Sequence, residues 1–188
     1  MKKYWHIALM LFCVLMITSC GDDEEEDTRI LDEVWKTQNE VAFAEKEQDS
    51  TFAKCESQGN DGFIFMKQLK KGNGKRLYFT SRAEVYYKGV LIDNTVFEQK
   101  LLYDGIPFKV AVSSVYSNYN SSTGKGYNAP PVEGWTIALQ YMCEGDIWEV
   151  WIPASLGYDN YVGKEDVPLG STLIYEIEVV KALHINEY

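Results

Sequence analysis

The chain has 188 residues and is acidic, with 18 Lys and Arg against 28 Asp and Glu and a formal net charge of −10. Without a basic stripe, such a chain is repelled by phosphate backbones, so the composition excludes nucleic acid as a partner. The sequence contains only two histidines, His6 and His184. A zinc site or a histidine-based catalytic triad lacks ligands, and we expect neither a metal nor a cofactor.

Residues 1–19 are predicted to form a signal peptide. Lys2 and Lys3 precede an apolar run over residues 7–17, which is shorter than the roughly 20 residues of a membrane-spanning helix. The run ends in Leu-Met-Ile-Thr-Ser-Cys, which resembles the lipobox cut by the lipoprotein signal peptidase. This resemblance implies that Cys20 is lipidated and anchors the chain to the membrane. An ordinary secreted protein with a chance cysteine is the alternative.

The lipidated segment, residues 20–28, is predicted to be a solvated tether. Residues 21–27 read GDDEEED, with six acids in seven positions, and such a run repels itself and buries no surface. An acidic stretch after the lipid cysteine also resembles the surface-export signal of Bacteroidetes lipoproteins. We therefore expect an outer-membrane lipoprotein of the cell envelope, and leave open whether it reaches the cell surface.

An N-terminal helical segment, residues 29–60, is expected before a domain that spans residues 61–188. Ile30, Val34 and Val41 form part of a loose apolar stripe that predicts a helix over 29–57. Residues 59–62 break the pattern, 62–69 are a strand candidate and 71–75 a turn. Two cysteines remain after processing, Cys55 and Cys143. A disulfide between them and two separate thiols are both compatible with the sequence.

From residue 82 the pattern changes to strands, predicted over 85–91, 146–152 and 172–181. In the last of these, Leu173, Tyr175, Ile177 and Val179 alternate with polar residues, which is the period of a strand with one buried face. Residues 132–142 are predicted to form one short helix. Several strands around one helix indicate an α+β fold with an antiparallel sheet.

Two further features concern surfaces. Residues 116–131 are rich in Gly, Ser and Asn and are predicted to form a long loop.

In the strand over 146–152, Ile147 and Trp151 lie on the face opposite Trp148, where water is expected. We predict that the helix over 29–57 covers this face, or that the face binds a partner.

Three separated segments of the chain resemble FKBP-type peptidyl-prolyl cis-trans isomerases. Residues 85–98 read VYYKGVLIDNTVFE, similar to the family's V-x-Y-x-G-x-L-x-D-G-x-x-F-D. Residues 132–135 read VEGW and continue to IPASLGY at 152–158, while 167–180 read VPLGSTLIYEIEVV, similar to I-P-P-x-x-x-L-x-F-x-V-E-L. The resemblance implies an FKBP-like fold from about residue 85 to 183: a curved antiparallel half-barrel wrapped around a short central helix, here with an extra N-terminal helix.

The resemblance also implies a catalytic pocket without nucleophile, metal or cofactor. Trp135 would form its floor and the Tyr158 hydroxyl the donor at its rim, while Glu98 stands where the family has aspartate. An apolar pocket of this kind favours the twisted, less dipolar X-Pro amide over the planar one. The walls would be formed by Tyr87, Phe97, Phe108, Val132, Val167 and Tyr175.

Three departures from the family pattern affect this expectation. The side chain of Glu98 is one methylene longer than that of aspartate. Between Val110 and Val132 the chain has additional residues, which would act as a lid, extend the substrate groove or block the entrance. Asp159 follows Tyr158 in place of the usual glycine, and residues 160–166 lack the apolar side chains that often overhang the cavity in the family.

The main functional hypothesis is that the chain is a prolyl isomerase that assists the folding of envelope or surface proteins. Its partners would be proline-containing polypeptides, an FK506-like macrolide as a candidate ligand, and the membrane through Cys20. The alternative is a weak or inactive FKBP-fold module that binds peptide or glycan through the pocket and the loop at 113–131. The third hypothesis is a lipoprotein with a purely structural role.

Overall fold

The computed structural model describes residues 30–59, 62–159, 161 and 164–187. The predicted signal peptide, the acidic tether and Cys20 lie outside the described residues. None of the described helices has the length and apolar content needed to cross a bilayer.

The described residues form two α-helices, four short 3-10 helices and seven strands. The α-helices are α2 (Glu33–Ala44) and α3 (Glu133–Tyr141), and the 3-10 helices are Glu45–Glu47, Leu102–Asp104, Ser114–Tyr116 and Ala154–Leu156. The strands are β1 (Ala53–Glu56), β2 (Phe63–Lys70), β3 (Arg82–Val90), β4 (Val96–Lys100), β5 (Phe108–Ala111), β6 (Ile147–Ile152) and β7 (Leu173–Leu183).

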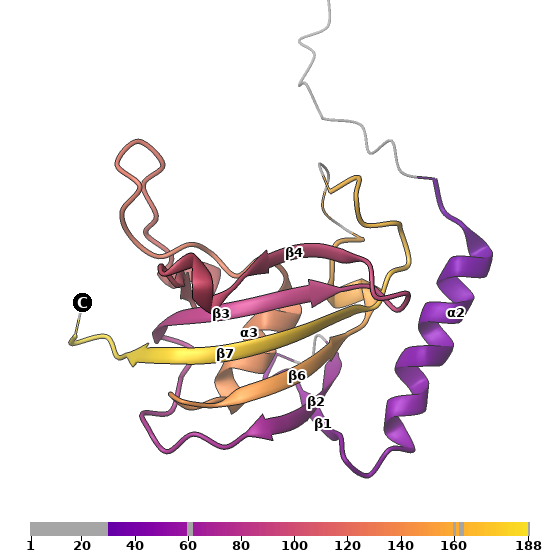
Figure 1. Ribbon diagram of the computed structural model, residues 1–188, viewed down its shortest axis with the longest axis horizontal. Helices are drawn as coiled ribbons and strands as arrows, with labels where there is room; N and C mark the ends of the chain where they lie inside the picture. Colours follow the sequence, from indigo (N-terminus) through magenta and orange to yellow (C-terminus); the bar gives the residue numbers. More distant parts are fainter. Residues whose placement is uncertain (1–29, 60–61, 160, 162–163, 188) are drawn as a thin grey trace, which may run out of the picture.

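All strands belong to one antiparallel sheet in the order β1-β2-β6-β7-β3-β4, and β5 also pairs with β3. The first half of β3 pairs with β5 and the second half with β4, so these two short strands follow one another along β3. Figure 1 shows the sheet with α3 lying behind it. The predicted α+β class, with an antiparallel sheet over one helix, is confirmed.

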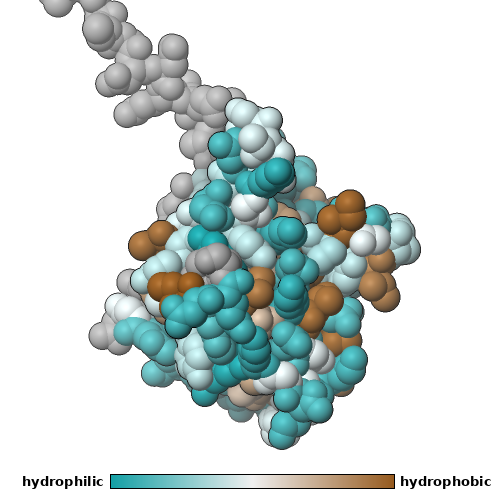
Figure 2. Space-filling view, turned by 90° about the vertical axis from the view of Figure 1, so that its left-hand side faces the viewer, coloured by the Kyte–Doolittle hydropathy of each residue, from teal (hydrophilic) through white to brown (hydrophobic). Residues whose placement is uncertain are grey.

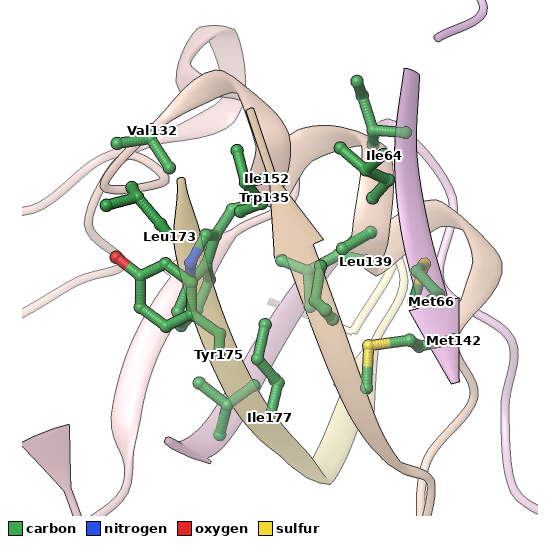
Figure 3. Close-up of a cluster of buried hydrophobic side chains, with 14 of the residues drawn as sticks. Ile64, Met66, Val132, Trp135, Leu139, Met142, Ile152, Leu173, Tyr175 and Ile177 are labelled. Carbon is green, nitrogen blue, oxygen red and sulfur yellow. The ribbon is translucent and has the colours of Figure 1, made fainter. Parts of the chain in front are cut away.

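The core lies between this sheet and α3. Leu173, Tyr175, Ile177 and Val179 have no solvent exposure, so the predicted buried face of β7 is confirmed. Gly134 allows α3 to approach the sheet, because a Cβ atom there would lie 2.4 Å from the Ile152 side chain. In Figure 3 the side chains of α3 and of β2, β6 and β7 meet in this space.

The helix predicted over 29–57 is wrong for its last third. α2 ends at Ala44, and the Asp49 carboxylate accepts hydrogen bonds from the Thr51 amide at 2.9 Å and the Thr51 hydroxyl at 2.7 Å. Such a side-chain turn competes with helical hydrogen bonding. The following residues form β1, whose backbone pairs with β2 and whose Cys55 side chain is buried.

Helix α2 is held next to the start of β7 by buried hydrogen bonds (Figure 1). Asn39 has no solvent exposure. Its side-chain oxygen accepts from the Thr172 amide at 2.8 Å, and its backbone oxygen accepts from the Thr172 hydroxyl at 3.1 Å. The Trp35 indole donates to the Ser171 hydroxyl at 2.9 Å.

The face of β6 that carries Trp151 is covered by residues that follow α2. The Phe52 ring meets Trp151 edge-on at 6.3 Å between ring centroids, and the Lys46 amine lies 4.1 Å from the indole. Trp151 is 9% exposed as a result. The prediction was that a helix over 29–57 covers this face. The segment does cover it, but the residues in contact with Trp151 lie beyond the α-helix, so the predicted docking of the helix on Trp151 is wrong.

The two remaining cysteines are free thiols in this structure. Cys55 is buried, and this burial raises the pKa of its thiol to about 11. A thiol that is protonated and shielded from solvent reacts slowly. Of the two alternatives left open by the sequence, the structure has separate thiols.

The Asn39 contacts make a testable contribution to stability. Asn39→Ala leaves the buried Thr172 amide without its acceptor, and an unsatisfied buried donor costs about 1–3 kcal/mol. We expect a loss of that order in the free energy of unfolding, measured by denaturant titration. Gln38→Ala, at an exposed position of the same helix, should stay within about 0.5 kcal/mol of the parent. Equal losses in the two variants would contradict this role of Asn39.

Candidate active site

The indole of Trp135, at the start of α3, is surrounded by rings from three strands. Tyr87 of β3 lies 5.1 Å from it, Tyr175 of β7 5.2 Å and Phe108 of β5 6.4 Å, between ring centroids. All three meet the indole at 89–90°. This edge-to-face geometry places the positive ring edge against a negative ring face. The sheet and helix thus hold four aromatic side chains in one cluster.

A second pair of rings continues this cluster. Phe97 of β4 lies 5.5 Å from Tyr175 and 6.2 Å from Tyr158, again edge-on. Gly89 of β3 makes room for them, since a Cβ atom there would lie 2.7 Å from the Phe97 ring and 2.8 Å from the Tyr175 ring. A side chain at position 89 would therefore push the two rings apart.

The structure brings the nine predicted site residues to one region. Val132 and Val167 are buried in the same core as the rings, and Figure 3 shows Val132 in the same cluster of side chains as Trp135 and Tyr175. Tyr87 and Phe108 are half-buried and pack against it. Glu98, which follows Phe97, is joined to the cluster by hydrogen bonds. The proximity of these residues agrees with the sequence analysis, whereas their catalytic roles stay predictions.

Glu98 forms a polar corner within this apolar cluster. Its carboxylate accepts a hydrogen bond from the Tyr175 hydroxyl at 2.5 Å and from the Tyr158 hydroxyl at 3.3 Å. The Lys164 amine lies 3.5 Å from the same carboxylate. The resemblance indicated Tyr158 as a donor, but it gave no hydroxyl for position 175, where the family pattern has phenylalanine. The longer side chain of Glu98 and the additional hydroxyl of Tyr175 therefore meet in one contact.

The tyrosines of the cluster are held in their protonated form. Burial, and next the charge of Glu98, raise the pKa of Tyr87 to about 12. The same two causes, in the same order, raise the pKa of Tyr158 and of Tyr175 well above the ordinary value. Near neutral pH all three hydroxyls are therefore hydrogen-bond donors.

Lys164 was not singled out by the sequence analysis, and it closes the rim. Its amine lies 5.2 Å from the centroid of the Tyr158 ring and 5.8 Å from that of Phe97. Such a cation is attracted both by the ring faces and by the Glu98 carboxylate. The sequence gave no signal for it, because a single lysine in a polar loop has no pattern that marks it.

The floor of the predicted pocket is closed to solvent in this structure. Trp135 and Tyr175 have no exposure, and Tyr158 is 7% exposed. Within the part of the chain that the structure describes, the indole nitrogen of Trp135 has no hydrogen-bond partner. Tyr158 and Lys164 lie beside Glu98 at the rim of this cluster. The half-buried Tyr87 and Phe108 rings form the side that remains partly accessible.

Asp159, the third departure from the family pattern, has a structural role. Its carboxylate accepts a hydrogen bond from the Gly170 amide at 2.9 Å. This contact joins the residue after Tyr158 to the segment that leads into β7. Gly170 has a φ of +78°, a conformation that glycine adopts without strain.

The polar groups among the rings of this site are the Glu98 carboxylate, the tyrosine hydroxyls and the Lys164 amine. Over the described ranges, the chain has no group of three His, Cys, Asp or Glu side chains placed to hold a metal ion. The side chains of the site provide an apolar surface that excludes water, and hydroxyl groups that donate hydrogen bonds.

Comparison with known proteins identifies a family that this chain resembles. The model of the family described as FKBP-type peptidyl-prolyl cis-trans isomerase matches residues 73–180. The macrophage infectivity potentiator of Trypanosoma cruzi is 26% identical over 176 residues, covering 92% of this chain and 77% of that protein. The outer membrane protein MIP of Legionella longbeachae is 34% identical over 114 residues, covering 61% of this chain and 42% of that protein.

A solved structure has the same fold. The peptidyl-prolyl cis-trans isomerase of Pseudomonas syringae pv. tomato superimposes with a TM-score of 0.61 at 24% identity, covering 81% of this chain and 96% of that one. The chain spans less than half the length of several bacterial relatives that it matches. The FKBP-like fold and the family resemblance are confirmed. Since the family match covers more than half of its residues, the chain belongs to the FKBP-type peptidyl-prolyl cis-trans isomerase family.

Proposed function

We propose that the chain catalyses cis–trans isomerisation of X-Pro bonds in polypeptides at the cluster around Trp135. The observation that carries this proposal is the edge-on enclosure of the Trp135 indole by Tyr87, Phe108 and Tyr175, next to the Glu98 carboxylate. Such an enclosure offers one apolar floor for a proline ring and one group of donors beside it.

The chemistry fits a site without a nucleophile. Rotation about a peptide bond has a barrier of about 18–20 kcal/mol, because the planar amide is stabilised by resonance. X-Pro bonds isomerise uncatalysed over tens to hundreds of seconds. The twisted transition state has lost resonance and is less dipolar, so a dry aromatic site favours it over the ground state. Each ~1.4 kcal/mol of this preference gives about a tenfold increase in rate.

Each residue of the cluster would have a different role in the proposed isomerisation. The Trp135 indole would support the proline ring, and the half-buried Tyr87 and Phe108 rings would exclude water from it. The Tyr158 hydroxyl, now directed at Glu98, would donate to a substrate carbonyl once the rim opens. Glu98 would then keep its hydrogen bond from Tyr175, so the carboxylate is never left without a donor. An FK506-like macrolide would occupy the same site.

One observation favours a second candidate function. Tyr158 and Lys164 close the rim over Phe97, and Trp135 is unexposed. A site that opens rarely would bind peptide or glycan weakly at the half-buried rings and catalyse little. This would be an FKBP-fold binding module that also uses the loop at 113–131.

The isomerase proposal predicts a loss of activity when the floor or the donor is removed. Tyr158→Phe should lower kcat/KM by about 5- to 30-fold, the equivalent of one hydrogen bond at about 1–2 kcal/mol. Trp135→Leu should lower it at least about tenfold because the flat apolar floor is lost. The measurement is the isomerisation rate of a short X-Pro peptide, followed by a protease-coupled assay or by NMR exchange.

Trp148→Leu is the matched control for the loss of a core tryptophan. Trp148 packs against the same core from β6 but makes none of the ring contacts given above for Trp135. It should reduce stability while keeping the rate. No acceleration by the parent protein, together with retained peptide binding, would support the binding module instead.

The tyrosine cluster predicts a specific pH dependence of stability. The pKa of Tyr87 is raised to about 12 in the folded state, against about 10 in the unfolded chain. Its contribution to stability is complete below about pH 10 and is lost as pH rises through about 12. We expect the free energy of unfolding to fall between pH 9 and 12, roughly, and to fall less steeply in Tyr87→Phe. Urea midpoints measured across this range test this. Identical pH profiles for parent and variant would contradict it.

We also propose that the chain is an outer-membrane lipoprotein anchored through Cys20, and that it assists the folding of envelope or surface proteins. Supporting observations are the apolar run over residues 7–17, the Leu-Met-Ile-Thr-Ser-Cys sequence and the acidic tether that follows. The similar Legionella longbeachae protein is named an outer membrane protein. An anchored isomerase would act on chains that fold close to the membrane.

Anchoring through Cys20 is tested by lipid labelling. In cells given a labelled fatty acid, the parent should carry the label and sediment with membranes, because acyl chains supply the hydrophobic attachment. Cys20→Ala should lose the label and leave the membrane fraction. Cys13→Ala, within the predicted signal peptide, should still be labelled. Continued labelling of Cys20→Ala would rule out this anchor.

A further inference from the structure

A pocket of about 600 Å³ lies beside the candidate active site. Its lining comes from the end of β4, from residues 106–109 around the start of β5, and from the loop over 113–131. We call it the loop-side pocket. Phe108 lines this pocket and also packs against Trp135 and Tyr87, at 6.4 and 5.6 Å between ring centroids. The two sites therefore share a wall.

The loop side of this pocket is an ordered hairpin. The Asn118 amide donates to the Tyr127 carbonyl at 2.9 Å, and the Tyr127 amide donates back to the Asn118 side chain at 2.9 Å. Gly126 has a φ of +103°, and a Cβ atom there would lie 2.3 Å from the Asn118 carbonyl. A larger residue at position 126 would break this closure.

The hairpin is attached to the sheet at two points. The Asn128 carbonyl accepts from the Ala111 amide at 2.8 Å, which extends the pairing of β5. The Arg82 guanidinium of β3 donates to the Tyr116 carbonyl at 3.0 and 3.2 Å and lies 5.2 Å from the Tyr127 ring. Figure 1 shows the loop projecting from the end of the sheet where β3 begins. The loop thus forms a fixed wall.

The pocket is positively charged in an otherwise acidic chain. Lys100, Lys109 and Lys125 line it, while the whole chain has a formal net charge of −10. Lys109 lies 3.9 Å from the Glu84 carboxylate. Within the described residues, Lys100 and Lys125 form no ion pair. Like charges around one cavity raise the local concentration of anionic ligands.

The same pocket also offers apolar surface. Ile106 is 68% exposed and Tyr119 is 47% exposed, and both line the cavity. Seen from the side on which the loop projects, the surface is mainly hydrophilic with separate hydrophobic patches (Figure 2). A ligand that matches both features carries negative charge next to an apolar side chain.

We propose that the loop-side pocket binds the residues that flank proline in the substrate, and that it selects flanks with acidic residues beside an apolar one. This inference rests on the proposed isomerase function. An extended chain advances about 3.3 Å per residue, so three or four residues on one side of a proline at Trp135 reach past Phe108 into the pocket. The inserted loop thereby extends the substrate groove and determines its preference.

The test compares peptides that share one X-Pro core. One peptide has only this core, and one has a neutral flank. Two further peptides carry a flank of Asp, Glu and Leu, placed before the core in one peptide and after the core in the other. The parent should show a kcat/KM about 5- to 10-fold higher for an acidic flank than for the neutral flank at low salt, as expected for several exposed charge pairs. This ratio should approach one at about 1 M salt, where charges are screened.

Two sets of lysine substitutions test whether the preference for acidic flanks arises in the loop-side pocket. The triple variant Lys100→Gln, Lys109→Gln and Lys125→Gln should reduce the ratio to about one. The control triple variant, Lys54→Gln, Lys70→Gln and Lys71→Gln, changes the net charge equally but lies on or beside β1 and β2, at the opposite edge of the sheet, and should keep the ratio. Tyr119→Ala should lower kcat/KM for the two acidic-flank peptides, which carry Leu, more than for the core peptide.

The possible results distinguish a failure of this inference from a failure of the proposed isomerase function. Activity on the core peptide without a preference for acidic flanks would overturn this inference and leave the isomerase function intact. A preference that survives in the loop-side triple variant, or that disappears equally in the control triple variant, would also overturn it. Absence of activity toward every peptide would overturn the isomerase function, and this inference with it.

Discussion

The Glu98 carboxylate lies against a cluster of buried rings, and a charge in this place must be supplied with hydrogen-bond donors. The donors are the hydroxyls of Tyr158 and Tyr175, and the Lys164 amine adds a countercharge. Because these groups come from the rim, from β7 and from the loop before it, one carboxylate fixes the position of three distant segments. The contacts of Tyr158 and Lys164 at the rim follow from this requirement, whereas burial is the main cause that raises the pKa of the tyrosines.

The close approach of the surrounding elements depends on small residues. Gly89 leaves space for Phe97 and Tyr175, and Gly134 lets α3 approach β6, which places Trp135 under the sheet. The segment that leads into β7 is further held by Asp159 and, from outside, by Asn39 of α2. The N-terminal helix therefore stabilises the frame of the candidate site, although it contributes no side chain to the ring cluster.

Period-two alternation predicted β6 and β7 and the buried face of β7, because side chains on a half-buried sheet are sorted by burial. The family pattern predicted which rings would meet. The helix over 29–57 was extended too far because the pairing of β1 with β2 is a tertiary effect that local periodicity does not contain. Lys164 and the Tyr175 hydroxyl were missed since their roles depend on a partner, Glu98, far away in sequence.

The cluster at Trp135 and the loop-side pocket would recognise a substrate through different interactions. At Trp135 a ligand must enter a dry, closed cluster, so selection there acts on the shape and dipole of one amide and tolerates little variation. The loop-side pocket is open to water and uses exposed charges, which act weakly and over several residues. Phe108 separates the two environments. An insertion at this wall adds contacts for the substrate chain and leaves the hydrogen bonds of Glu98 to Tyr158 and Tyr175 in place.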